Sequence, residues 1–374
     1  MNKTRVLAAV FALLAACAYK LPEAEVLKIF ARHSFKEHSP EKLSALLRGS
    51  GLAGLKLEDK YSEVVLSKRR VKKSPVKPAP SAGMLVGAKG GAYYLLRVFK
   101  GSPAEAAGLK DGDKLLAVNS SAPGSEEFFK ALSGSQEFRI KAARRTKAGV
   151  SEFEAEVKAG EFSLPLVFGL YEPETSAAFV RIGLFFEDSA AIAAAGLGGL
   201  RRSGAKSVIL DLRGNKGGSP EEAAALLKLF ASKPGPVLAI TSRHTGYTQV
   251  FAAEARGKLA GTRVAVLVDP ATSMTGEVFA ASLKEIAGAA VIGGKTAGSV
   301  SIQRTFALGE GRGLRLTVAR LAPPSGSDLE GAGLAPDSPV DPATRNAWSS
   351  SPADALLKDP AYLRALEILK SKTP

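Results

Sequence analysis

The chain has 374 residues, 45% of them hydrophobic, which is enough for about two or three globular domains. Its formal net charge is +15, and two basic runs, KRRVKKSPVK (68–77) and RIKAARRTK (139–147), contribute to it. We interpret these runs as solvated segments, with attraction to an anionic membrane surface or envelope polymer as the alternative. Nucleic acid is disfavoured as a partner because no aromatic platform for bases accompanies the charge. The single cysteine, Cys17, excludes disulfides within the chain.

Residues 1–17 have the form of a lipoprotein signal peptide. A basic start, MNKTR, precedes an apolar run (6–16) that is too short to span a bilayer. Leu14-Ala15-Ala16-Cys17 resembles the lipobox of bacterial lipoproteins, whose cysteine is acylated. We therefore expect an exported protein of the periplasm or cell envelope, anchored in the membrane through lipid on Cys17. An ordinary secretory signal with an incidental cysteine is the alternative, and no later segment is long and apolar enough to cross a membrane.

The next segments are a predicted N-terminal helical region (18–67) and a basic linker (68–80). Leu27 and Phe30 share one face of a first predicted helix, and Pro40 begins a second. The prolines of the linker argue against regular structure there.

Residues 81–158 are predicted to form a domain of short strands with one longer helix over 125–134. The stretch GSPAEAAGLKDGDKLLAVNSS (101–121) resembles the core of a bacterial PDZ domain, in which Gly108 and Gly112 supply turns. Another small β-rich domain is the alternative.

The PDZ resemblance implies a peptide-binding segment at the start of this domain. In such domains a peptide adds a strand, and backbone N–H groups hold its terminal carboxylate. The segment that corresponds here is GMLVG, which comprises Gly83, Met84, Leu85, Val86 and Gly87.

From 165 to 345 strands alternate with helices. Continuous apolar runs such as VAVLV and SVILDL are typical of strands buried on both faces of an α/β layer. Residues 346–374 form a tail with a short amphipathic helix, DPAYLRALEILKSK.

Five segments in this order resemble the carboxyl-terminal processing (tail-specific) serine proteases. They are LEDKYSEVV (57–65), SVILDLRGNKGGSPEEAAALLKLF (207–230), AAVIGGKTAGSVSIQ (289–303), GLRLTVARLAPPSGSDLEGAGLAPDSPV (313–340) and KDPAYLRALEILK (358–370). The resemblance implies an α/β protease-like core with ClpP/crotonase-like β-α layers, joined to a PDZ domain and an N-terminal helical segment. It also implies that the Gly217-Gly218 backbone helps to form an oxyanion hole, and it implies no cofactor and no metal.

Active members of that family use a serine nucleophile, a lysine base and a supporting glutamine. When the family's motifs are aligned on Glu277, the nucleophile position is Met274; when they are aligned on Gln303, the lysine position is Ser299. A thioether has no proton to lose, and a serine hydroxyl is far too weak a base at neutral pH. Of the three family positions, Gln303 alone is retained.

Two other arrangements remain open from the sequence. Ser273 or Thr275 could serve as a displaced nucleophile with Lys295 as base, although both flank Met274 at a predicted helix start and are more simply interpreted as helix caps. His244 could act as a base in a histidine-dependent branch of the family, but it is more simply a surface-loop histidine that lacks a serine partner.

The sequence therefore predicts a tail-specific protease relative of the cell envelope that does not cleave by the Ser–Lys mechanism. Its expected role is to bind C-terminal or extended peptides of envelope proteins. The rival hypotheses are an active serine endopeptidase centred on Ser273 and a structural partner of an active paralogue.

Overall fold

The computed structural model describes residues 23–66, 80–134, 137–147, 149–162, 164–172, 175–309, 311–341, 356 and 359–371. The predicted signal peptide with Cys17 and most of the basic linker lie outside these residues. Within them, no helix combines the length and the apolar character needed to cross a membrane. Contacts divide the chain into two units, and each is described by itself. Unit 1 comprises 1–73, 240–249 and 301–320, and unit 2 comprises the rest.

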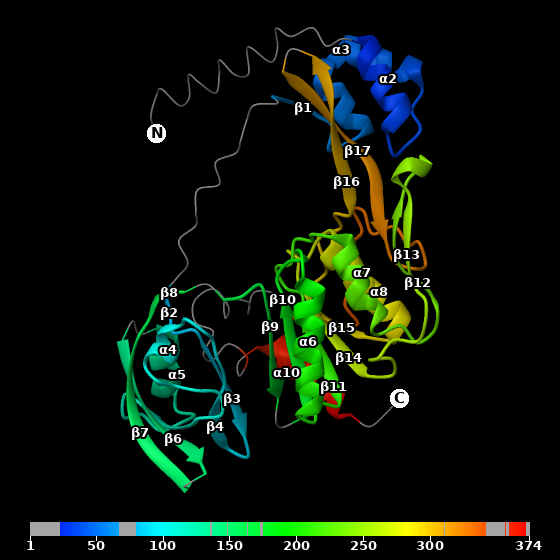
Figure 1. Cartoon of the computed structure of the whole chain (residues 1–374). Coiled ribbons are helices and arrows are strands. Elements are labelled where there is room, and N and C mark those ends of the chain that lie inside the picture. Colours follow the sequence, from blue (N-terminus) through cyan, green and yellow to red (C-terminus); the bar gives the residue numbers. More distant parts are fainter. Residues whose placement is uncertain are drawn as a thin grey trace, which may run out of the picture. The chain divides into compact units, whose positions relative to one another are not determined.

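Unit 1 combines the N-terminal helices with strands from much later in the chain (Figure 1). Its elements are α2 (Glu23–His33), α3 (Pro40–Glu58), β1 (Glu63–Leu66), the 3-10 turn η1 (Thr245–Tyr247), β16 (Ser301–Gly309) and most of β17 (Arg312–Ala322). Strand β17 pairs antiparallel with both β1 and β16. Strands β12 (Gly235–Thr241) and β13 (Gln249–Ala253) belong to this unit only in part. The N-terminal region, predicted to be helical, thus also contributes a strand to this sheet.

The helices of unit 1 pack on this sheet through one apolar cluster. Val26 and Phe30 of α2 and Leu55 of α3 are fully buried against Leu314 and Leu316 of β17. The period of apolar residues along α2, close to 3.6, places these side chains on one face of the helix.

Unit 2 contains an antiparallel sheet in the order β3-β4-β5-β6-β7. These strands are Met84–Lys89, Ala92–Val98, Lys114–Val118, Glu137–Thr146 and Gly149–Lys158; α4 (Pro103–Ala106) and α5 (Glu126–Gly134) accompany them, and β2 (Pro80–Ser81) pairs with β8 (Gly160–Glu161). Phe128 of α5 is fully buried with Met84 and Ile140 in one core. The strands and the helix follow the predicted order.

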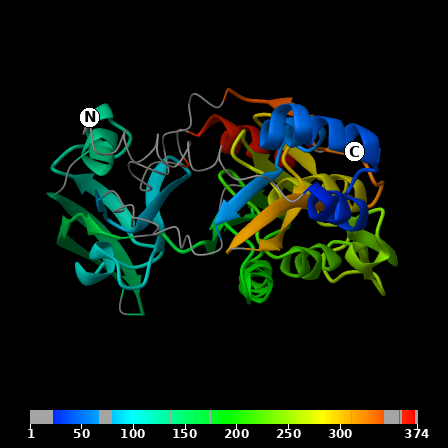
Figure 2. The same cartoon turned by 90° about the horizontal axis from the view of Figure 1, so that it is seen from above.

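The second sheet of unit 2 has the order β18-β15-β14-β11-β10-β9. Its strands are Ser338–Pro339, Ala290–Gly293, Arg263–Val268, Ser207–Asp211, Ala177–Ile182 and Val167–Glu172. All neighbours are parallel except β9 and β10. Helices α6 (Ser189–Arg202), α7 (Pro220–Lys228) and α8 (Thr275–Ala287) lie on one side of this sheet, and α10 (Pro360–Lys370) lies on the other (Figures 1 and 2). The predicted alternation of strands and helices is thus present, and the mixed α/β content agrees with the expected fold class.

Candidate functional site

Loops at the carboxyl ends of the parallel strands carry most of the predicted site residues. The loop after β11 contains Gly217 and Gly218, the loop after β14 leads to Met274, and the loop after β15 carries Ser299. Open parallel sheets place ligand sites at this edge, because the strand ends present backbone groups and loops there.

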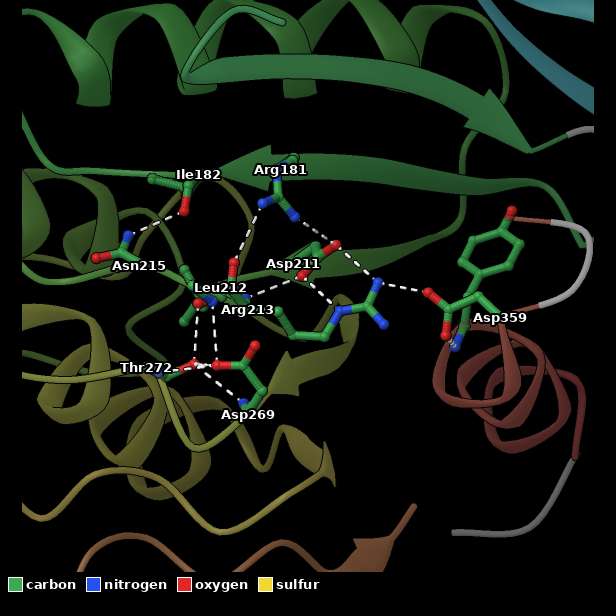
Figure 3. Close-up of polar contacts among 11 residues, drawn as sticks. Arg181, Ile182, Asp211, Leu212, Arg213, Asn215, Asp269, Thr272 and Asp359 are labelled. Carbon is green, nitrogen blue, oxygen red and sulfur yellow. Dashed lines mark hydrogen bonds and ion pairs between the residues drawn. The ribbon is translucent and has the colours of Figure 1, made fainter. Parts of the chain in front are cut away.

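Asp269 ties the first two of these loops together (Figure 3). It is 2% exposed, and its Oδ1 accepts backbone N–H bonds from Gly214 (3.1 Å), Ala271 (2.9 Å) and Thr272 (2.8 Å). Thr272 Oγ1 donates to the carbonyl of Leu212 at 3.0 Å. These bonds fix the spacing between the ends of β11 and β14, and neither side chain was predicted from the sequence to belong to the site.

Asn215 makes a second set of bonds between the loops. It is fully buried, and its Nδ2 donates to the carbonyl of Ile182 at 2.9 Å (Figure 3). Its Oδ1 accepts from the N–H of Gly217 at 2.7 Å, and its carbonyl accepts from the N–H of Ser273 at 2.9 Å. One asparagine thereby connects the ends of three strands. The run RGNKGG, in which an asparagine precedes two glycines, is the sequence signal that could have found it.

Met274 has a strained backbone at the start of α8. Its φ of 53° and ψ of −129° lie where residues other than glycine are rarely found, a conformation that costs about 1–3 kcal/mol. Its N–H donates to the carbonyl of Ser299 at 2.8 Å, so the two family positions are joined through the backbone. The interpretation of Ser273 and Thr275 as helix caps is wrong: Met274 precedes the first helical residue, and no side chain caps the helix.

Close contacts require glycine at positions 217 and 218. Their φ values are 101° and 110°. A Cβ at 217 would lie 2.6 Å from the Met274 Cβ, and one at 218 would lie 1.9 Å from the carbonyl oxygen of Phe185. Only glycine allows the chain to pass between these groups.

Two backbone N–H groups are available to an anion or a carbonyl oxygen beside Met274. The N–H of Gly217 is taken by Asn215. Within the described ranges, the N–H groups of Gly218 and Thr275 have no hydrogen-bond partner, and the Thr275 hydroxyl donates to the Gly218 carbonyl at 2.8 Å. An oxyanion site at this edge would therefore use Gly218 and Thr275, rather than Gly217 with Gly218 as the sequence predicted.

Glu277 positions the loop that carries Ser299. It is fully buried in α8, and its carboxylate accepts from the hydroxyl of Thr296 and from the N–H groups of Gly298 (2.8 Å) and Ser299 (3.2 Å). These charge-assisted bonds to one carboxylate hold the loop against the start of α8.

The other candidate residues are not joined to Met274 by any contact given for the described residues. Lys295 is exposed and forms no ion pair there, and no bond joins it to Ser273. Gln303 lies in β16 of unit 1, and its Nε2 donates to the carbonyl of Ser301 at 2.7 Å. His244 also belongs to unit 1, where its ring packs edge-on to Tyr247 with centroids 6.3 Å apart.

A buried ion network lies at the carboxyl end of β11 (Figure 3). Asp211 is fully buried and pairs with Arg181 (3.0 Å) and Arg213 (2.9 Å), and Arg213 also pairs with Asp359 of the tail at 2.6 Å. Burial acts to raise the pKa of Asp211, but the two guanidinium groups outweigh it and hold that pKa below its usual value. Burial likewise acts to lower the pKa of Arg213, and Asp211 and Asp359 outweigh it.

The predicted peptide-binding segment forms β3 at the edge of the antiparallel sheet. Within the described ranges β3 pairs only with β4, so its other edge has no strand partner. Met84 and Val86 point into the core of this sheet, whereas Leu85 is fully buried in a second cluster with Phe99. Gly83 has a φ of 66°, and its N–H donates to Ser81 Oγ at 3.1 Å. All five residues from 83 to 87 are buried, so a peptide would contact their backbone.

The described residues contain no cluster of three or more histidine, cysteine or acidic side chains that could hold a metal ion.

The described geometry can be compared with known proteins. The family model of peptidase family S41 matches residues 176–340. This part of the chain is therefore similar to the S41 peptidases. The match covers β10 to β18 and therefore includes the loops around Met274.

Curated relatives of the chain are carboxyl-terminal processing proteases. The Carboxy-terminal processing protease CtpA of Bacillus subtilis is 29% identical over 257 residues, which are 68% of this chain and 54% of that protein. The Carboxyl-terminal-processing protease of Synechocystis is 30% identical over 282 residues, 72% of this chain and 63% of that protein. The chain thus spans only about half to two thirds of the length of these relatives. The resemblance predicted from the sequence is confirmed at the level of the family.

Solved structures show the same fold. The photosystem II D1 C-terminal processing protease aligns with a TM-score of 0.54 at 19% identity, covering 94% of this chain and 97% of that chain. A putative S41 protease from Bacteroides fragilis aligns with a TM-score of 0.51 at 16% identity, covering 93% and 97%. The chain therefore has the S41 peptidase fold with mixed α/β content.

Proposed function

We propose that this S41 protein captures extended or C-terminal peptides of envelope proteins and does not cleave them by a Ser–Lys mechanism. The observation that carries the proposal is a methionine at the strained position that opens α8. The surrounding backbone retains what peptide binding needs, because Gly218 and Thr275 present two N–H groups to a carbonyl oxygen.

The side chains of Met274 and Ser299 lack the groups that a Ser–Lys mechanism needs. The thioether of Met274 cannot be deprotonated and so cannot form an acyl-enzyme. The hydroxyl of Ser299 cannot accept a proton at neutral pH as a neutral lysine amine would. Glu277 and the backbone bond between the two positions still hold the loop, so the scaffold persists without its reacting groups.

We further propose that residues 81–158 act as a PDZ domain and that the protein is anchored through Cys17. The edge of β3 that has no strand partner in the described ranges supports the first part, because a peptide could add there as a further strand. The lipobox-like LAAC supports the second, because lipid on Cys17 would hold the peptide-binding units at a membrane.

Activity is tested on the purified full chain with an unfolded protein substrate and a serine-directed covalent probe. We expect neither cleavage nor labelling. Cleavage that Ser273→Ala abolishes would overturn the proposal and establish a displaced nucleophile. Ser282→Ala is the matched control, because Ser282 is buried in α8 and its hydroxyl has no hydrogen-bond partner to lose.

Scaffold competence is tested by Met274→Ser with Ser299→Lys. The pair acts as a unit, because a serine without a base stays protonated and a base without a nucleophile has no task. We expect probe labelling in the double variant and none in either single variant. If the Met274→Ser single variant is labelled as strongly as the double variant, the lysine of Ser299→Lys does not supply the base.

Peptide addition is tested by hydrogen exchange of the β3 amides. We expect a peptide with a free apolar C-terminus to slow exchange at 84–87 and its amidated form to do so far less, because the carboxylate contact is lost. Equal protection by both peptides would reject the carboxylate-binding assignment of this segment.

A further inference from the structure

A pocket of about 210 Å³ lies in unit 1 between α2 and the end of β16, the two elements that Figure 1 places together. One wall is basic and the other is apolar. The basic wall consists of Lys28, Arg32 and His33 of α2, accompanied by the carboxylate of Glu25. None of these residues belongs to the predicted cleavage or peptide-binding sites.

Lys28 and Arg32 give the pocket a surplus of positive charge. They are four residues apart on one helix, so they share a face, and both are exposed. Neither forms an ion pair within the described ranges. Two like charges at this spacing destabilise a helix, and an anion bound between them would relieve the repulsion.

His33 is held in a fixed orientation at the inner end of this wall. Its ring stacks on Phe306 with centroids 4.2 Å apart, and its Nδ1 is 2.7 Å from the hydroxyl of Tyr247. Burial and the neighbouring His244, Arg32 and Arg304 lower the pKa of His33. The lowered pKa disfavours the imidazolium form of His33, which stands beside the cationic side chains of Arg32 and Arg304.

The apolar wall is formed by Ile29, Phe306 and Ala307. Ile29 is 5% exposed and belongs to the core of unit 1, so this wall is backed by rigid packing. A bare phosphate would leave the apolar wall in contact with water. A ligand that carries an anion next to an apolar group satisfies both walls.

We propose that this pocket binds the C-terminal residue of a polypeptide, with its carboxylate at Lys28 and Arg32 and its apolar side chain on Ile29 and Phe306. It is a second carboxylate site, in a different unit from β3. The proposal does not depend on whether the protein cleaves its ligands or on binding at β3.

The test is NMR of the purified full chain, because the chain has only three histidines and the His33 ring can be assigned with His33→Gln. The probe is an acetylated hexapeptide ending in leucine, with its amidated form as comparison. We expect the free-acid peptide to shift the His33 ring resonance saturably and the amide to leave it unchanged. The variant K28Q/R32Q should weaken the response at least tenfold, whereas the control K36Q, an exposed lysine beyond α2, should not.

Three results would overturn the proposal. An equal response to the amidated peptide would exclude the carboxylate contact. An equal response to inorganic phosphate would indicate a simple anion site. Binding to vesicles of anionic phospholipid that K28Q/R32Q abolishes, without any peptide response, would assign the pocket to a membrane surface. If the free-acid peptide shifts the His33 resonance but does not slow hydrogen exchange of the β3 amides, only the proposed peptide site at the edge of β3 is rejected.

Discussion

Backbone conformation at Gly218 and Met274 determines the shape of the site more directly than any side chain that surrounds it. The backbone of Gly218 lies so close to the carbonyl oxygen of Phe185 that a Cβ would not fit, and Met274 adopts a φ of 53°. Strain of this kind persists only where neighbouring bonds over-determine the chain, and Asn215 and Ser299 supply such bonds here.

Gly218→Ala should therefore destabilise the protein by more than the ordinary glycine-to-alanine effect. Its Cβ would meet the Phe185 oxygen at 1.9 Å, and the backbone would have to move. We expect a loss of about 1–3 kcal/mol in urea unfolding. The control Gly196→Ala lies in α6 with nothing within 4 Å and should be neutral or stabilising by up to about 1 kcal/mol. Equal unfolding midpoints for the two variants would contradict the strained-loop interpretation.

The buried charge of Asp211 gives a prediction about pH. The folded-state pKa of Asp211 lies below its ordinary value of 3.8, so its contribution is complete above that pH and is lost as the pH falls through the folded-state pKa. Asp211→Asn leaves Arg181 and Arg213 without their shared carboxylate and should cost about 3–5 kcal/mol at pH 7. The difference in free energy of unfolding between Asp211→Asn and the native chain should become smaller below about pH 4. Urea unfolding at pH 7 and at pH 3 measures this difference.

An exposed ion pair serves as the comparison for the buried pairs of Asp211. Asp111 and Arg97 are 3.2 Å apart, but both side chains are nearly half exposed. Asp111→Asn should cost at most about 1 kcal/mol at either pH. A similar loss for the two variants would mean that the buried network contributes no more than an exposed pair.

At the scale of elements, apolar patterns predicted most strands and helices from 177 to 293 because each has one or two buried faces, whereas β13 (Gln249–Ala253), which is mostly exposed, was missed. Strand β16 was missed because it lies beside a single partner, β17, and its pattern is interrupted by a bulge between Ile302 and Gln303. Gln303 therefore lies in a strand that was not predicted. The bonds of Asp269 and Asn215 could not be predicted either, since they join loops that become neighbours only when parallel strands align.

Helix α10 is attached to the sheet by its first residues as well as by its apolar face. Asp359 Oδ1 accepts from the N–H groups of Ala361 (3.0 Å) and Tyr362 (3.2 Å), and Oδ2 pairs with Arg213. One carboxylate thereby caps the helix and completes the ion network at the carboxyl end of β11.

Two substitutions at Asp359 separate these roles. Asp359→Asn keeps a capping oxygen and loses the ion pair, whereas Asp359→Ala loses both. We expect the alanine variant to be less stable than the asparagine variant by about 0.5–2 kcal/mol, the worth of an N-cap. Hydrogen exchange of the α10 amides is the measurement, and faster exchange should appear in both variants. Identical exchange in the native chain and both variants would show that the apolar face alone holds the helix.

At the scale of the whole molecule, two features of the sequence would bring the chain to a membrane, and they act by different physics. Lipid on Cys17 would hold the protein by burial of acyl chains, which salt does not weaken. The net charge of +15 would attract it to anionic lipids, and that attraction is screened within about 3 Å at 1 M salt.

Salt extraction of isolated membranes therefore distinguishes attachment through lipid from electrostatic attraction. We expect the native protein to stay in the membrane fraction at 1 M salt, because the lipobox-like LAAC predicts acylation of Cys17. Cys17→Ala should remove the acyl chains and leave only the electrostatic attraction, so any membrane-bound mature variant should be released by salt. A variant that replaces the lysines of 68–77 with glutamine should stay bound at every salt concentration. Release of the native protein by salt would show that charge, and not lipid, brings the chain to the membrane.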